Sequence, residues 1–185
     1  MRAFKAFNKD MTCTSGKGIY QYKENIIYHE DKAQAHETGF HCAEYILDCY
    51  KYYPMTASTV ICPVEASGDI DEDGSDTKIS CTTMTIGSRL SREEIVFEAL
   101  KYLAKHSKFK DAKNIHIEKG TDIFICIVRG KDPIASGTKG TVLGILKETA
   151  RHKVIGLAVY KVDGKKIKPG RFYNINGEEV QNEEG

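Results

Sequence analysis

The side chains in this sequence that best suit a chemical reaction are His41 and Glu65. His41 follows Gly39-Phe40, where we expect the glycine to open a tight turn ahead of a short helix. Because an imidazole titrates near neutrality, His41 could act as a general acid–base group, with Glu65 from a returning strand as its partner. Such a pair, with a lysine to steady the phosphate, suits RNA cleavage through the 2′-hydroxyl. We therefore predict that His41, Glu65 and Lys5 are catalytic.

A structural interpretation of the same residues stays open. In it, the His41 ring caps a backbone carbonyl at the turn, and Glu65 is a solvated residue of its strand. The two interpretations differ in whether the imidazole and the carboxylate face one hollow, which the sequence does not decide.

Lysines gather at and after the end of the clearest helix in the chain. Phosphate contacts need such a local concentration of positive charge, and nearby His106 and Phe109 could stack on bases. The alternative is a solvated helix end with scattered lysines. The predicted nucleic-acid-binding residues are Lys101, Lys105, Lys108, Lys110 and Lys113.

Neither a metal nor a cofactor is predicted. Residues 69–74 match the first six positions of a calcium loop, but position twelve is Ser80 in place of the glutamate that calcium needs. His41, Cys42 and Cys49 match no zinc spacing, even with Cys13 added. Phosphate-loop, dinucleotide and metalloprotease fingerprints do not occur in the sequence.

The composition is that of an ordinary soluble protein. The chain has 185 residues, 41% of them hydrophobic and 29% charged, with a net charge of +1, so no overall field draws it to nucleic acid or membrane. Six cysteines occur without a C-x-x-C pair, and no apolar run has the length of a signal peptide or a membrane span. We expect reduced thiols in a cytosolic protein.

Periodicity predicts an α+β protein. The segment 39–53 is expected to be a turn followed by an amphipathic helix, which Pro54 ends. Ser91 and Glu94 form a capping box that predicts one long helix over 92–106. An acidic turn is expected over 68–76. The predicted strands of this part cover residues 2–7, 19–22, 26–28, 59–66 and 78–86.

After the long helix the chain is predicted to be a small all-β unit. Asp163-Gly164 and Asn176-Gly177 are hairpin signals, since glycine tolerates the positive φ of tight turns. We place a β-rich domain at residues 1–110 and the small β domain at 111–185. The predicted strands of the second domain cover residues 115–117, 122–128, 141–146, 154–162 and 171–175.

Four blocks resemble an uncharacterised domain family common in bacteriophages and prophages of Gram-positive hosts. They are Phe4 to Cys13 (FKAFNKDMTC), Gly39 to Pro54 with its GFHC start, Val64 to Asp69, and Val162 to Tyr173 (VDGKKIKPGRFY). The last block is similar to the closing segment of those proteins, which in longer relatives follows a solenoid-like repeat. The resemblance implies a phage accessory protein, and such proteins often counter host defences.

The order of features also weakly resembles the ADP-ribosyltransferase fold. In that resemblance Arg2 or Lys5 would hold NAD phosphates, and Glu65 would bind the nicotinamide ribose. The Ser-Thr-Ser block and the Glu-x-Glu motif of those enzymes are missing from this chain.

These observations favour a phage anti-defence protein, anti-CRISPR-like, in the host cytoplasm. Its expected partner is a host defence nuclease or the guide RNA, on which it would act by binding or by RNA cleavage, with no membrane involved. The alternatives are an enzyme of ADP-ribosyltransferase type and a phage structural or adhesion module.

Overall fold

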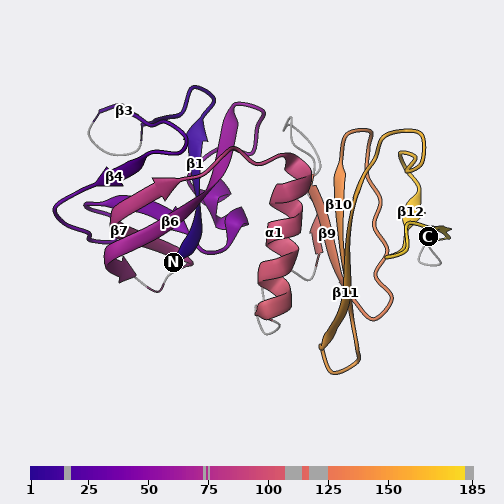
Figure 1. Ribbon diagram of the computed structural model, residues 1–185. Coiled ribbons are helices and arrows are strands. Elements are labelled where there is room, and N and C mark those ends of the chain that lie inside the picture. The colour runs from indigo at the N-terminus through magenta and orange to yellow at the C-terminus, as the bar shows by residue number, and fades with distance from the viewer. Residues whose placement is uncertain (15–17, 73, 75, 107–113, 117–124, 182–185) are drawn as a thin grey trace. The chain divides into compact units, whose positions relative to one another are not determined.

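A computed structural model describes residues 1–14, 18–72, 74, 76–106, 114–116 and 125–181. Contacts divide the chain into two compact units, Met1–Leu90 and Ser91–Gly185, and each is treated by itself (Figure 1). The division differs from the expected one near residue 110. The helix α1 (Arg92–Lys105) packs on strands of the second unit and so belongs to that unit, while residues 107–113 lie outside the described part of the chain.

The first unit, here the N-terminal unit, is an antiparallel sheet of five strands. The strand order is β4-β7-β5-β1-β6, and β6 pairs with β7 as well, so four of the strands close into a ring. Two further short strands, β2 (Thr12–Cys13) and β3 (Tyr20–Gln21), pair with each other. The strands of the sheet are β1 (Arg2–Asn8), β4 (Ile27–His29), β5 (Phe40–Ala43), β6 (Thr59–Glu72) and β7 (Lys78–Ile86).

Strand β1 is paired very differently along its two edges. Along β6 every residue from Arg2 to Asn8 has a partner, whereas along β5 the register has the single pair Phe4↔Ala43. Alternate residues of β1, such as Ala3 and Phe7, enter the core of the ring. The wall of the ring is therefore loosely joined between β1 and β5.

The predicted turn over 68–76 is wrong in its first half, because β6 continues to Glu72. A bulge between Ser67 and Ile70 lets the strand resume its pairing with β7. Gly68 has φ +76°, and a Cβ there would collide with the Thr82 hydroxyl. The glycine thus bends the strand where the sequence indicated that it ends.

The segment 39–53 is a strand and a short 3-10 helix in place of the predicted amphipathic α-helix. Gly39 has φ +87°, as the expected turn requires. After it, β5 pairs with β7 over His41↔Ser80 and Cys42↔Ile79, so His41 is a strand residue. The 3-10 helix η1 spans Ile46–Lys51.

The second unit, here the C-terminal unit, places α1 against a four-stranded sheet. The predicted capping box is confirmed: the Glu94 amide donates to the Ser91 hydroxyl at 3.2 Å, and the Ser91 amide donates to the Glu94 carboxylate at 2.7 Å. The strand order is β11-β10-β9-β8, with β9 and β10 parallel. The strands are β8 (Asn114–His116), β9 (Ile125–Gly130), β10 (Val142–Glu148) and β11 (Val154–Lys161).

A small hairpin completes the C-terminal unit. Strands β12 (Phe172–Tyr173) and β13 (Glu179–Val180) flank the predicted turn at Asn176-Gly177. No hairpin forms at Asp163, whose carboxylate accepts from the backbone amides of Lys165 and Ile167. The helix α1 packs on β10 and β11, and the elements described within residues 111–185 are all strands. The β-rich character of the chain, with one long helix among the described residues, is confirmed.

The packing of α1 on β10 depends on Gly144. A Cβ there would lie 2.7 Å from Val96 Cγ1 on the helix and 3.1 Å from Ile127 Cγ1. We expect Gly144→Ala to lower the free energy of unfolding by about 1–3 kcal/mol, because a stiff β-branched side chain cannot move aside. Urea unfolding measures this loss.

A second substitution and a control complete this test. Val96→Ala in the Gly144→Ala background should recover part of the lost free energy of unfolding. If the effects of the two substitutions are strictly additive, residue 144 does not press against Val96. Gly156→Ala on β11 is the control, since its Cβ would meet the movable Ile175 Cδ1 at 2.8 Å and should cost less.

Candidate functional site

A cavity of about 400 Å³ lies where β1 and β5 separate. Residues 4–6 of β1 and 41–43 of β5 line it, together with Glu30 and residues 36–39 of the segment that joins β4 to β5. Cys49 in η1, the following Tyr52 and Tyr53, and Lys78 at the start of β7 also line it. The single register pair between β1 and β5 leaves room for this opening in an otherwise closed ring.

Lys5 is one of the buried residues that line the cavity. Its side chain is on the core face of β1, the residue is 6% exposed, and Nζ donates to the His41 carbonyl oxygen at 2.8 Å. Nζ also lies 5.6 Å from the ring centroids of both Phe7 and Tyr22. Among the residues that the structure describes, no carboxylate pairs with this ammonium, and the His41 carbonyl is its one hydrogen-bond acceptor.

The Lys5 ammonium has hydrogen-bond donors that the described residues do not use. An ammonium has three N–H donors, and the protein takes up one of them. A buried cation without a counter-charge is costly, and an anion from a ligand would remove that cost. Lys5 was predicted as the residue that steadies a phosphate, and its place in the cavity suits that role.

His41 lines the cavity as a neutral imidazole. Burial, reinforced by the positive charges of Lys78 and Lys5, lowers the pKa of His41 to about 4. The ring also hydrogen-bonds the Gln34 backbone. Its Nε2 atom is buried and has no hydrogen-bond partner within the described ranges. A shielded imidazole of low pKa is a poor general base at neutral pH.

Glu65 is not among the residues that line the cavity. It lies opposite Arg2 on β6, and β6 and β5 flank β1 on opposite edges. Its side chain is 62% exposed, and Oε1 accepts from the Met1 amine at 2.7 Å. The structure therefore brings Lys5 and His41 together. Glu65, the expected carboxylate partner, lies on the other edge of β1 as a solvated strand residue, as in the structural interpretation.

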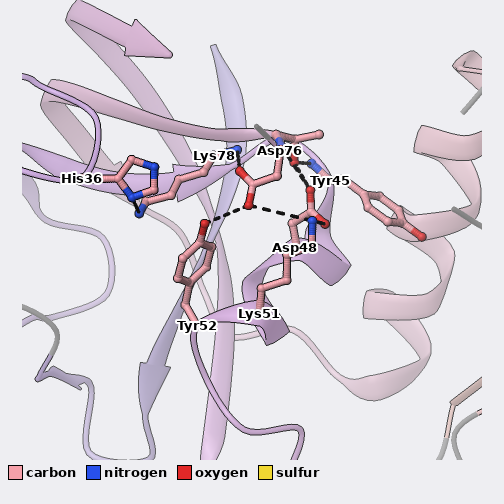
Figure 2. A network of polar contacts seen from close by, with 8 residues as sticks. His36, Tyr45, Asp48, Lys51, Tyr52, Asp76 and Lys78 are labelled. Atoms are coloured by element: carbon pink, nitrogen blue, oxygen red, sulfur yellow. Dashed lines mark hydrogen bonds and ion pairs between the residues drawn. The ribbon is translucent and has the colours of Figure 1, made fainter. Parts of the chain in front are cut away.

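A polar network forms one side of the cavity (Figure 2). Lys78 Nζ lies 3.0 Å from His36 Nδ1 and 4.4 Å from the centroid of the Tyr52 ring. The Tyr52 hydroxyl donates to Asp76 Oδ2 at 2.8 Å, and the Lys78 backbone amide donates to Asp76 Oδ1 at 2.7 Å. Asp76 thus holds the tyrosine and the start of β7 in one geometry.

Asp48 extends this network to η1 (Figure 2). Its buried carboxylate accepts from the Thr77 hydroxyl at 2.7 Å and from the Thr77 amide at 3.2 Å. Lys51 Nζ lies 2.9 Å from Asp48 Oδ1 and 3.8 Å from Asp76 Oδ2. The 3-10 helix is therefore fixed to the start of β7, which positions Tyr52 and Tyr53 at the cavity.

The sequence did not indicate His36 or Lys78 as site residues. Lys78 was expected on the wet face of its strand, and His36 lies in a polar segment without periodicity. Their proximity results from the turn closed by Gln34 and Thr38 in the segment that joins β4 to β5, which brings residue 36 beside residue 78. Spacing along the chain carries no signal for such a contact.

The structure describes two of the five lysines that were expected to bind nucleic acid. Lys101 pairs with Glu98 on the same helix at 3.0 Å, and Lys105 is exposed. Lys108, Lys110 and Lys113 lie outside the described residues. The basic patch stays a prediction.

The cysteines are structural in character. All six are buried, and none of them is in a disulfide bond. Burial raises the pKa of Cys49, which lines the cavity, to about 12, so it is a protonated thiol and not a nucleophile. In the described part of the chain, no three His, Cys, Asp or Glu side chains are placed to hold a metal ion, and Asp69 to Glu72 of the calcium-like segment belong to β6.

Residues 1–98 match the model of a protein family described as "Domain of unknown function (DUF7666)". Since the match covers more than half of the chain, the protein belongs to this family. The match includes the cavity and the three N-terminal sequence blocks, whereas the block Val162 to Tyr173 lies beyond it. No curated protein and no solved structure matches the chain. Over the described ranges, no helix has the length and apolar character of a membrane span.

The low pKa of His41 makes stability depend on pH. Between about 6.5, its ordinary value, and about 4, the unfolded chain binds a proton that the folded protein excludes, so stability falls as the pH is lowered through this range. We expect a smaller loss between pH 7 and pH 4.5 in His41→Gln than in the wild type, as measured by urea unfolding.

The pKa of His41 can also be measured directly in the folded protein. In a ¹H NMR titration the ring protons of His41 should move with an apparent pKa near 4. An apparent pKa near 6.5, with equal pH dependence in the variant and the wild type, would show that the ring is not desolvated.

Proposed function

We propose that this protein is a phage-encoded anti-defence protein that acts in the host cytoplasm by binding the guide RNA of a host defence nuclease. The phage assignment is supported by the resemblance of the blocks Phe4–Cys13, Gly39–Pro54 and Val64–Asp69. The mode of action is supported by the cavity between β1 and β5, which suits the capture of a phosphate.

One observation carries the proposal of phosphate binding: the buried Lys5 ammonium has no counter-carboxylate among the described residues and uses one of its N–H groups within the protein. A phosphate oxygen would form charge-assisted hydrogen bonds with the remaining donors. The volume of about 400 Å³ lies within the range of sites for small ligands, roughly 300–1,000 Å³. Lys78 adds positive charge at the same cavity.

Binding is favoured over RNA cleavage by the state of the expected catalytic groups. His41 is neutral with a shielded Nε2 atom, and Glu65 lies on the other edge of β1. The same position of Glu65 disfavours the ADP-ribosyltransferase alternative, because that enzyme would need the carboxylate beside the bound nucleotide. The structural-module alternative has no specific contact in its favour.

The test is the affinity of the protein for a CRISPR guide RNA. We expect Lys5→Met, which keeps the length of the side chain and removes its charge, to weaken binding about tenfold or more, since hydrogen bonds to a charged group contribute about 1.5–3 kcal/mol. Fluorescence anisotropy at fixed salt measures the affinity. Lys23→Met is the matched control, because Lys23 is exposed in the same unit and does not line the cavity.

Integrity of the RNA is followed in the same experiment. The wild type should leave the guide RNA intact. Cleavage that is lost in His41→Ala would replace binding by catalysis as the mode of action, and undetectable binding of the RNA would overturn the proposed function.

A further inference from the structure

We infer that the cavity between β1 and β5 is a site for a single nucleotide bearing a terminal phosphate monoester, with the phosphate on the Lys5 ammonium. Where that nucleotide is the end of a guide RNA, the inference rests on the proposed function and specifies the part of the RNA that is held. Where it is a free mononucleotide, the site stands by itself. Both sources present the same chemical group.

The depth of Lys5 selects an end over the interior of a nucleic-acid strand. The residue is 6% exposed and reaches the cavity from the core face of β1. An internal phosphodiester would carry chain on both sides, and both would have to pass the opening in the ring. A terminal monoester carries chain on one side only, and it presents three oxygens to the N–H donors of the ammonium.

The distribution of charge limits the ligand to one phosphate. Lys5 and Lys78 line the cavity, but so do the carboxylates of Glu30 and Glu37. Additional phosphates of a polyphosphate would be placed close to these carboxylates and repelled. Ribose hydroxyls and base amino groups are neutral, and they can donate hydrogen bonds to these carboxylates. The cavity therefore suits one charged group beside Lys5 and a neutral remainder rich in hydrogen-bond donors.

The aromatic lining suits a base. Tyr53 lines the cavity, and its hydroxyl donates to Cys13 Sγ at 3.0 Å, which fixes the ring. The Tyr52 ring is held by the bond from its hydroxyl to Asp76 (Figure 2). Bases stack on such rings irrespective of their identity. A volume of about 400 Å³ is near the lower end of the range for small-ligand sites, which favours one nucleotide over several.

The first experiment compares ligands that differ only in the phosphate. By isothermal titration calorimetry with the full chain, we expect AMP to bind at least tenfold more tightly than adenosine, and ATP to bind no more tightly than AMP. In the Lys5→Met variant the difference between AMP and adenosine should vanish, whereas Lys23→Met should keep it. Equal binding of AMP and adenosine to the wild type would overturn the inference.

A second measurement does not depend on the folding of a variant. In ¹⁵N-labelled wild-type protein, AMP should shift the amide resonances of residues 4–6 and 41–43, which line the cavity, and not those of the C-terminal unit. Shifts confined to other residues would overturn the assignment of the site.

RNA ends separate this inference from the proposed function. One RNA sequence is tested with a 5′-phosphate, with a 3′-phosphate and with hydroxyls at both ends. Tighter binding of one phosphorylated form supports both proposals. Binding that depends on Lys5 but is equally tight for all three RNAs overturns the terminal-phosphate inference and still supports RNA binding. Binding of AMP without binding of any RNA supports the nucleotide site and overturns the guide-RNA function.

Discussion

The unequal pairing of β1 is the constraint on which the rest of the N-terminal unit depends. Continuous pairing with β6 from Arg2 to Asn8 fixes the strand, while the single pair with β5 at Phe4↔Ala43 leaves the ring open beside it. Backbone groups in such a gap need other partners. The Lys5 ammonium provides one, since it donates to the His41 carbonyl and so joins the two strands through a side chain.

This arrangement makes one residue both structural and available for binding. Lys5 bridges β1 and β5 with one N–H, and its charge is stabilised by the rings of Phe7 and Tyr22 in place of a carboxylate. Asp48 and Asp76 hold η1, Tyr52 and the start of β7 together, so the aromatic lining of the cavity is fixed before any ligand arrives. Such preorganisation lowers the entropic cost of binding.

The C-terminal unit is built on a different principle, in which a helix covers a mixed sheet. The parallel pair β9 and β10 lies at its centre, and Gly144 allows the helix to approach β10 closely. Its most local features were predictable. The capping box at Ser91 and Glu94 and the turn at Asn176-Gly177 are decided by neighbours in sequence, and both occur where they were expected.

The sequence by itself determined the elements whose energetics are local: the strand over 78–86, the capped helix and the glycine turn at Gly39. It also indicated Lys5 and His41 as residues of interest. Tertiary structure decided their environment. His41, expected at a turn, is a strand residue because β5 pairs with β7, and Glu65 is separated from it because β1 lies between their strands. Burial and strand order are properties of the whole sheet, so spacing along the chain could not supply them.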